Sequence, residues 1–274
     1  MTFSLIDRTG SRHCPATDGG LLAAQSGESA VPKKKSLKRL LIIWSGLRIL
    51  SAIDRVLTRF SPLPEQDTFP RSTFPWIRHL EDNWTLVQAD AERILTSRHS
   101  IPPVREISPD HDMIAINDRW RSFFLRGYGL RHRENCLRCP ETARLLEDIP
   151  GLLTAFFSIL EPGAHIPCHT GPTKAILTAH LGLRVPHDRA ACRMRIGDRD
   201  VTWRQGELLL FDDMYPHEVW NDTDEDRVVL LLQIRRPERF PASLLRDGLL
   251  VAMRHSPFVQ DALRKLEMWP RKQA

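Results

Sequence analysis

Two histidines and one arginine occur in an order that could support metal chemistry. His169 precedes a segment of alternating polarity, His217 lies 48 residues later, and Arg227 lies ten residues beyond His217. Neutral imidazole is a good ligand for Fe(II), and the planar guanidinium group of arginine can bond both oxygens of a carboxylate. We therefore predict a metal held by His169 and His217, and a dicarboxylate cosubstrate whose distal end Arg227 clamps. The hydroxyl of Ser158, in the preceding apolar run, is expected to assist the clamp.

Each of these residues alone is weak evidence, because a lone histidine in a β-rich segment is more often structural. His165 stands four residues before His169, the spacing of two zinc ligands on a protease helix. Here we expect an irregular turn instead of a helix, and no glutamate follows His165, so the zinc-protease arrangement is absent. Cys136 and Cys139 form a lone C-x-x-C pair. Without a second pair it predicts ordinary thiols rather than a zinc site.

The elements that must position these side chains follow from the period of the apolar residues. Within 177–183 the odd-numbered positions are apolar, and Thr178 and His180 lie on the opposite face of a predicted strand. Several short strands with turns between them predict a sandwich or closed barrel. The other predicted strands of this region are 155–160, 192–196, 207–211 and 228–234.

Composition and patterning divide the chain into five predicted segments. With 274 residues and 42% hydrophobic residues, the chain suits one domain with extensions. The segments are a disordered stretch at 1–32, a basic amphipathic helix at 33–60, a helical and mixed lead-in at 61–150, the β core at 151–237 and a helical tail at 238–274.

The segment 33–60 interleaves basic and apolar residues at helical spacing. One interpretation is docking on an anionic membrane surface, with Trp44 at the interface. The other is a helix that packs on its own domain and leaves its basic face in water. Its longest apolar stretch, 40–47, is far shorter than the ~20 residues of a membrane span.

The net charge and the number of cysteines bear on the partners of the chain and on its cellular compartment. A net charge of +5 permits an anionic partner without requiring one, and no nucleic acid is expected. Five cysteines are a sparse and odd set for a disulfide framework, and the first 32 residues lack the apolar core of a secretory signal. We therefore expect a cytoplasmic protein, either free or peripheral on the inner face of a membrane.

Four motifs together resemble one enzyme family. The stretch 157–173 (FSILEPGAHIPCHTGPT) and the segments 180–183, 203–207 and 211–220 are similar to the aspartyl/asparaginyl β-hydroxylases, of the Fe(II)- and 2-oxoglutarate-dependent dioxygenase superfamily. The resemblance spans roughly residues 75–238. It implies a mainly β fold with flanking helices, namely a double-stranded β-helix, which is a jelly-roll or cupin-like barrel. It also implies a hydroxylase that uses Fe(II), the small-molecule cosubstrate 2-oxoglutarate and O2, and produces succinate and CO2.

The resemblance assigns roles by position. His169 and His217 match the iron ligands, and Arg227 matches the clamp for 2-oxoglutarate. Gly171 stands where most of the superfamily supplies a carboxylate ligand; the β-hydroxylases lack it too, and water can fill the position. Halogenating relatives also lack this carboxylate, but the flanking motifs here resemble the hydroxylases. The remaining positions that match the cosubstrate pocket are Trp120, Ser158, Thr178 and His180.

Two substrate classes stay open, an Asp or Asn residue of a peptide and an acyl chain of a membrane lipid. Peptide-modifying members carry arginines just before the position of His180, where this chain has Ile176, Leu177 and Thr178. An acidic side chain is costly to bury without a cation, so this departure counts against a peptide. Two other classes of function are a non-catalytic cupin-like protein that binds a metal or small molecule, and a membrane-peripheral interaction protein that acts through 33–60.

Overall fold

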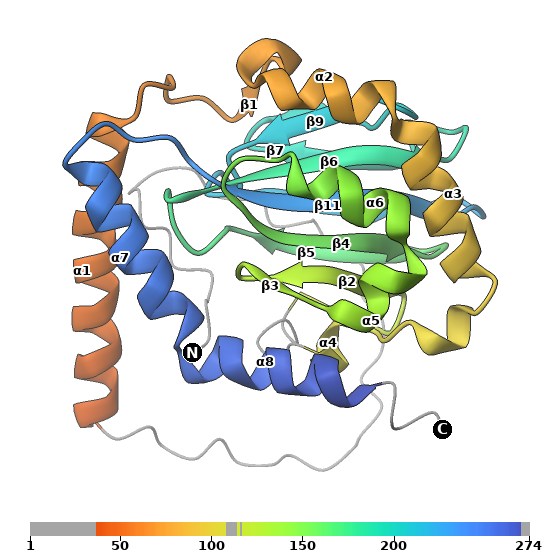
Figure 1. Ribbon diagram of the computed structural model, residues 1–274. Helices are drawn as coiled ribbons and strands as arrows, with labels where there is room; N and C mark the ends of the chain where they lie inside the picture. The colour runs from red at the N-terminus through yellow and green to blue at the C-terminus, as the bar shows by residue number, and fades with distance from the viewer. Residues whose placement is uncertain (1–36, 108–113, 116, 270–274) are drawn as a thin grey trace, which may run out of the picture.

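The computed structural model describes residues 37–107, 114–115 and 117–269, with only the course of the backbone for 37–47. The disorder predicted for 1–32 lies outside these residues. Two antiparallel sheets form the body of the protein (Figure 1). The larger sheet has the strand order β1-β9-β6-β11-β4-β2-β3, and the smaller has the order β5-β10-β7-β8. The strands are β1 (Thr68–Phe69), β2 (Trp120–Gly127), β3 (Leu130–Arg131), β4 (Leu152–Leu160), β5 (Ala164–His169), β6 (Ile176–Arg184), β7 (Cys192–Ile196), β8 (Arg199–Val201), β9 (Leu208–Phe211), β10 (His217–Asn221) and β11 (Arg227–Arg235).

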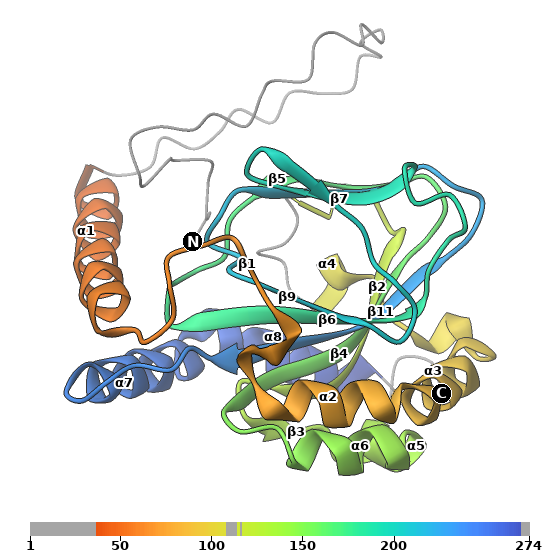
Figure 2. The same cartoon turned by 90° about the horizontal axis from the view of Figure 1, so that it is seen from above.

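From β4 to β11 the chain passes repeatedly between the two sheets. β4, β6, β9 and β11 lie in the larger sheet, while β5, β7, β8 and β10 lie in the smaller one. This winding is that of a double-stranded β-helix, so the predicted fold class is confirmed. Figure 2 shows the two sheets facing each other, with helices over the outer face of the larger sheet.

One detail of the strand prediction was wrong. His165, expected on an irregular turn, lies within β5 and pairs with Trp220 of β10. On the sequence alone, Pro167 argues against a strand here, because proline has no backbone N–H to donate to a ladder. Proline is tolerated there because β5 is an edge strand of the smaller sheet.

α2 and α3 cover the outer face of the larger sheet together with α6, and their apolar side chains share one core with the odd-numbered residues of 177–183 (Figures 1 and 2). The opposite face of β6 looks into the space between the sheets. The helices are α1 (Leu37–Phe60), α2 (Pro75–Asp82), α3 (Trp84–Leu95), α4 (Val104–Ile107), α5 (Arg133–Arg138), α6 (Pro140–Glu147), α7 (Ala242–Arg254) and α8 (Pro257–Met268), with short 3-10 turns at Arg71–Thr73 and Arg98–Ser100.

α1 and α7 pack against each other at one end of the barrel. Leu57 of α1 and Leu250 of α7 share a buried cluster with Ile176, the first residue of β6. This cluster fixes both helices to the sheet that carries β6 and β11. Within the described part of the chain, no helix is both long enough and apolar enough to cross a membrane.

The cysteines form no metal site in the described residues. Cys136, Cys139 and Cys192 are buried free thiols. Burial raises the pKa of Cys139 to about 12, so this thiol is not a ready metal ligand. Cys168 is in a disulfide, which departs from the expectation of unlinked cysteines.

Candidate active site

The two predicted metal ligands lie side by side on neighbouring strands. His169 ends β5, His217 begins β10, and the two residues are direct partners in the antiparallel ladder. Directly opposed residues of such a ladder project to the same face of the sheet. The centroids of the two imidazole rings are 4.1 Å apart, and the rings are inclined by 52°.

Backbone carbonyls orient both imidazoles. Nδ1 of His169 donates a hydrogen bond to the carbonyl oxygen of Pro167 (2.8 Å), and Nδ1 of His217 donates to that of Tyr215 (3.0 Å). With the proton on Nδ1, Nε2 of each ring is the unprotonated nitrogen that a metal takes. Burial lowers the pKa of His217, which keeps this imidazole neutral at physiological pH. This donor set fits Fe(II).

A carboxyl group that sequence reasoning missed lies next to the histidine pair. A Cβ atom at Gly171 would clash with Oδ1 of Asp213, and the backbone N–H of Gly171 donates to the carbonyl oxygen of Asp213 (2.7 Å). The Thr178 hydroxyl donates to Oδ2 of Asp213 (2.8 Å). Burial raises the pKa of Asp213 to about 7. Asp213 therefore occupies the space that a side chain at position 171 would fill.

This contact predicts the effect of a single methyl group. The backbone of Gly171 has no positive φ, so only the Asp213 carboxyl excludes a side chain. We expect Gly171→Ala to lower the free energy of unfolding by about 1–3 kcal/mol through overpacking. Denaturant unfolding measures the change. The combination with Asp213→Ala should recover most of the loss, and Gly248→Ala, where a Cβ meets nothing within 4 Å, is the matched control. Wild-type stability of Gly171→Ala would show that the Asp213 carboxyl is free to move.

Arg227 is a buried cation that no acidic side chain of the described residues neutralises. It begins β11, is 1% exposed, and has its guanidinium carbon 4.5 Å from the centre of the Trp203 ring. Its Nε and Nη1 have no hydrogen-bond partner, and no carboxylate of the described residues forms an ion pair with it. Burial lowers the pKa of Arg227 to about 10, which still leaves it charged at neutral pH. An isolated buried charge is costly, so this position is suited to an anionic ligand.

His180 and Phe211 connect the arginine to the histidine pair. Nε1 of Trp203 donates to Nδ1 of His180 (3.2 Å), so the proton of His180 is on Nε2, which has no hydrogen-bond partner. Burial, with a smaller contribution from Arg227, holds the pKa of His180 well below its ordinary value. The Phe211 ring lies edge-on to both His180 (5.1 Å) and His217 (5.7 Å). These contacts form a continuous path through the barrel interior.

Trp120 and Ser158 line the same interior from the edge of the larger sheet. Nε1 of Trp120 donates to the Ser158 hydroxyl (3.0 Å). Leu160 of β4 pairs with Trp120 on one side and with Arg227 on the other, so Trp120 and Arg227 lie in one row across three neighbouring strands. The structure thus brings all the predicted site residues into the barrel interior or to its end. Thr178 was predicted to line the cosubstrate pocket, but its hydroxyl donates a hydrogen bond to Asp213.

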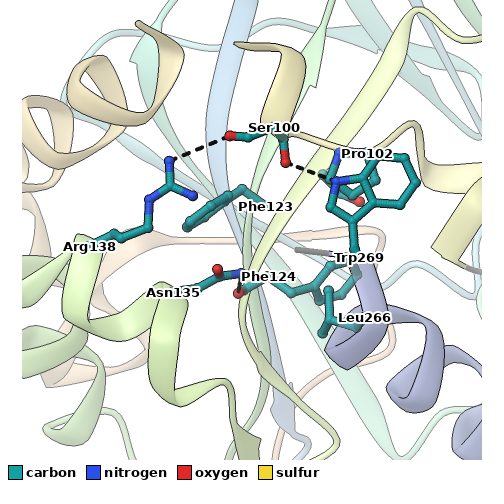
Figure 3. A pocket seen from close by; sticks show the side chains of 9 residues that line it. Ser100, Pro102, Phe123, Phe124, Asn135, Arg138, Leu266 and Trp269 are labelled. Carbon is teal, nitrogen blue, oxygen red and sulfur yellow. Dashed lines mark hydrogen bonds between the residues drawn. The ribbon is translucent and has the colours of Figure 1, made fainter. Parts of the chain in front are cut away.

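Two residues of this interior, Trp203 and Asp213, were not among the predicted site residues. Both stand in motifs that carried the family resemblance, in 203–207 and 211–220, and that membership was the available signal. A separate pocket of about 170 Å³ lies outside the barrel, and its lining includes Phe123, Phe124, Leu266 and Trp269 (Figure 3). It contains none of the predicted site residues.

Comparison with known proteins places this chain in a family. The family model described as "Aspartyl/Asparaginyl beta-hydroxylase" matches residues 81–237. The chain is 34% identical over 226 residues to the "Ornithine lipid ester-linked acyl 2-hydroxylase" of Rhizobium tropici, a match that covers 82% of this chain and 80% of that protein.

More distant relatives match a smaller part of the chain. The "Aspartyl/asparaginyl beta-hydroxylase" of Homo sapiens is 31% identical over 170 residues, which cover 60% of this chain but only 22% of the human protein. Among solved structures, a Pseudomonas putida prolyl-4-hydroxylase is 21% identical, with a TM-score of 0.37, and the match covers 59% of this chain and 99% of that one.

Proposed function

The chain belongs to the aspartyl/asparaginyl β-hydroxylase family, and from this premise we propose that it hydroxylates an acyl chain of a membrane lipid, with Fe(II) held by His169 and His217. Membership makes the chain a hydroxylase and implies dependence on iron and 2-oxoglutarate. The observation that carries the dependence on 2-oxoglutarate is the Arg227 guanidinium, which forms no ion pair among the described residues and is buried on the same path through the barrel as the two imidazoles.

Each residue of the interior has a defined task in this proposal. Nε2 of His169 and of His217 hold the metal, and the carbonyls of Pro167 and Tyr215 keep both rings in that tautomer. Bound Fe(II) supplies the oxidative chemistry, in which 2-oxoglutarate and O2 yield succinate and CO2 while one substrate carbon gains a hydroxyl. The protein supplies orientation and a dry cavity.

The cosubstrate is held at its distal end. Arg227 offers Nε and Nη1 to the distal carboxylate of 2-oxoglutarate, and the Trp203 ring limits rotation of the guanidinium by packing on its face. The Nε2–H of neutral His180 is a further donor in the same space. The Ser158 hydroxyl, anchored by Trp120, is the remaining polar group near the clamp.

A lipid substrate is favoured over a peptide by the residues around Thr178. Ile176 and Leu177 are buried and apolar where peptide-modifying relatives have arginines, and the Thr178 hydroxyl is engaged by Asp213. An acidic substrate side chain would find no cation among these three. The relative from Rhizobium tropici, matched over 80% of its length, is named as a lipid acyl hydroxylase.

Succinate formation from 2-oxoglutarate tests the proposal. Purified protein with Fe(II), ascorbate and air should release succinate, and the rate should rise several-fold with a bacterial lipid extract but not with a peptide pool. Stimulation by peptides alone would reassign the substrate to peptidyl Asp or Asn. A protein that binds iron but makes no succinate under any condition would be a non-catalytic, cupin-like binding protein.

A further inference from the structure

We propose that α7, together with the described part of α1, forms a docking surface for an anionic lipid bilayer. The proposal rests on the lipid substrate proposed above and adds the element that would bring the barrel to that substrate. It extends the surface from the basic segment at 33–60 to a helix almost 200 residues later in the chain.

The solvent side of α7 is apolar. Leu244 is 63% exposed and Val251 57% exposed, and their spacing of seven residues places them on one side of the helix. Between them, a Cβ at Gly248 would meet nothing within 4 Å. Phe240, just before the helix, is 76% exposed, while Ala242 and Leu250 on the opposite side are buried in the core. α7 is thus apolar both toward its core and toward water, which a helix with only a packing role does not require.

α1 adds a second apolar stripe and positive charge. Ile49 and Val56, again seven residues apart, are both exposed. Arg55 and Arg59 are exposed and form no ion pair with any described residue. The one acidic side chain in the described part of α1, Asp54, is buried. Exposed apolar side chains flanked by uncompensated arginines match a membrane surface that carries negative charge.

The same charge pattern surrounds α7. Arg239 precedes the helix and Arg254 ends it, and neither forms an ion pair within the described part of the chain. The acidic residue of the helix, Asp247, is bonded by Arg235 and Arg246, and its charge is therefore compensated. Complementarity of charge therefore selects an anionic bilayer as the occupant, rather than a neutral surface.

Hydrogen bonds connect this surface to the active site. Oδ1 of Asp54 accepts from the Thr173 hydroxyl (2.5 Å) and from the backbone N–H of Lys174 (2.9 Å). Both donors lie in the short connection from His169 to β6. Figures 1 and 2 show α1 at the end of the two sheets and α7 beside it. A bilayer that contacts these helices would lie at the end of the barrel where the proposed metal ligand His169 is found.

Vesicle binding by the full-length protein tests the surface without iron or cosubstrate. We expect co-sedimentation with phosphatidylcholine vesicles that contain phosphatidylglycerol, and little with phosphatidylcholine alone. Leu244→Gln combined with Val251→Gln should weaken binding about tenfold or more, because two exposed apolar side chains are lost from the interface. Leu137→Gln, at a leucine on α5 that is 73% exposed, is the matched control and should bind like wild type. Arg55→Gln combined with Arg59→Gln should reduce the preference for anionic vesicles.

Several outcomes would overturn the docking surface. Wild-type protein that stays in the supernatant with anionic vesicles would do so, as would an α7 double variant that sediments like the Leu137→Gln control. A double variant that instead changes the oligomeric state in sedimentation velocity would assign this face to a second copy of the chain. Failure here is distinct from failure of the proposed enzyme, because an active protein that ignores vesicles loses only the docking surface, and an inactive one that binds them keeps it.

Discussion

His169→Ala and His217→Ala should each abolish succinate formation and weaken Fe(II) binding by more than about 100-fold. The described residues contain no group of three or more His, Cys, Asp or Glu side chains placed to hold a metal, so each imidazole would be half of the proposed ligand pair. Even outer-sphere partners of metal ligands are worth about 10–100-fold in metal affinity, and a direct ligand should be worth more.

Iron content after dialysis and the rate of succinate release measure the two effects separately. His187→Ala is the matched control, because His187 has a side chain that is 97% exposed. It should retain wild-type iron and turnover. Iron-dependent turnover that persists in both site variants would remove the assignment of His169 and His217 as ligands.

Arg227→Ala should raise the KM for 2-oxoglutarate by about two to three orders of magnitude, with a smaller change in kcat. Truncating one partner of a buried, hydrogen-bonded charge pair costs about 2–5 kcal/mol, and here the orphaned partner would be the distal carboxylate of the cosubstrate. Arg227→Lys should fall between wild type and Arg227→Ala, because lysine keeps the charge but cannot form the bidentate contact. Initial rates over a range of 2-oxoglutarate concentrations provide both constants, and an unchanged KM in Arg227→Ala would refute the clamp.

Stability provides a second readout for the same residue. Burial depresses the pKa of Arg227 to about 10 from 12.5, so the folded state penalises the charged form, and the penalty is fully present at all pH values below about 10. Arg227→Met should therefore unfold at a higher temperature than wild type when no cosubstrate is present. Saturating 2-oxoglutarate should raise the Tm of metal-loaded wild type but not that of Arg227→Met. A destabilised Arg227→Met would indicate that the guanidinium is compensated in the native state.

The sequence by itself determined which residue types face the barrel interior. Alternation along 177–183 separated Thr178 and His180 from the apolar positions, and the structure places the apolar set under the helices and the other set between the sheets. This worked because the side-chain period of a strand is a local property of the chain. The order of His169, His217 and Arg227, together with the motifs around them, was likewise sufficient to identify the family.

The tertiary structure decided the contacts between distant residues. The pairing of His217 with His169 depends on the register of β10 against β5, and β5 was not predicted because Pro167 argued against a strand there. No hairpin turn joins β5 to β10, so their register is set by burial of one face of each strand in the assembled barrel.

Neighbouring residues of one motif also acquired different roles only in the fold. In the Asp212–Asp213 pair, Asp212 is bonded by Lys174 (2.8 Å) and Arg236, whereas Asp213 faces Gly171 and has no ion-pair partner among the described residues. The sequence shows only two aspartates in succession. Which of them meets a cation depends on the direction in which the folded backbone points each side chain. The lack of an ion pair at Arg227 among the described residues has the same origin, because the fold decides which charged groups lie near one another.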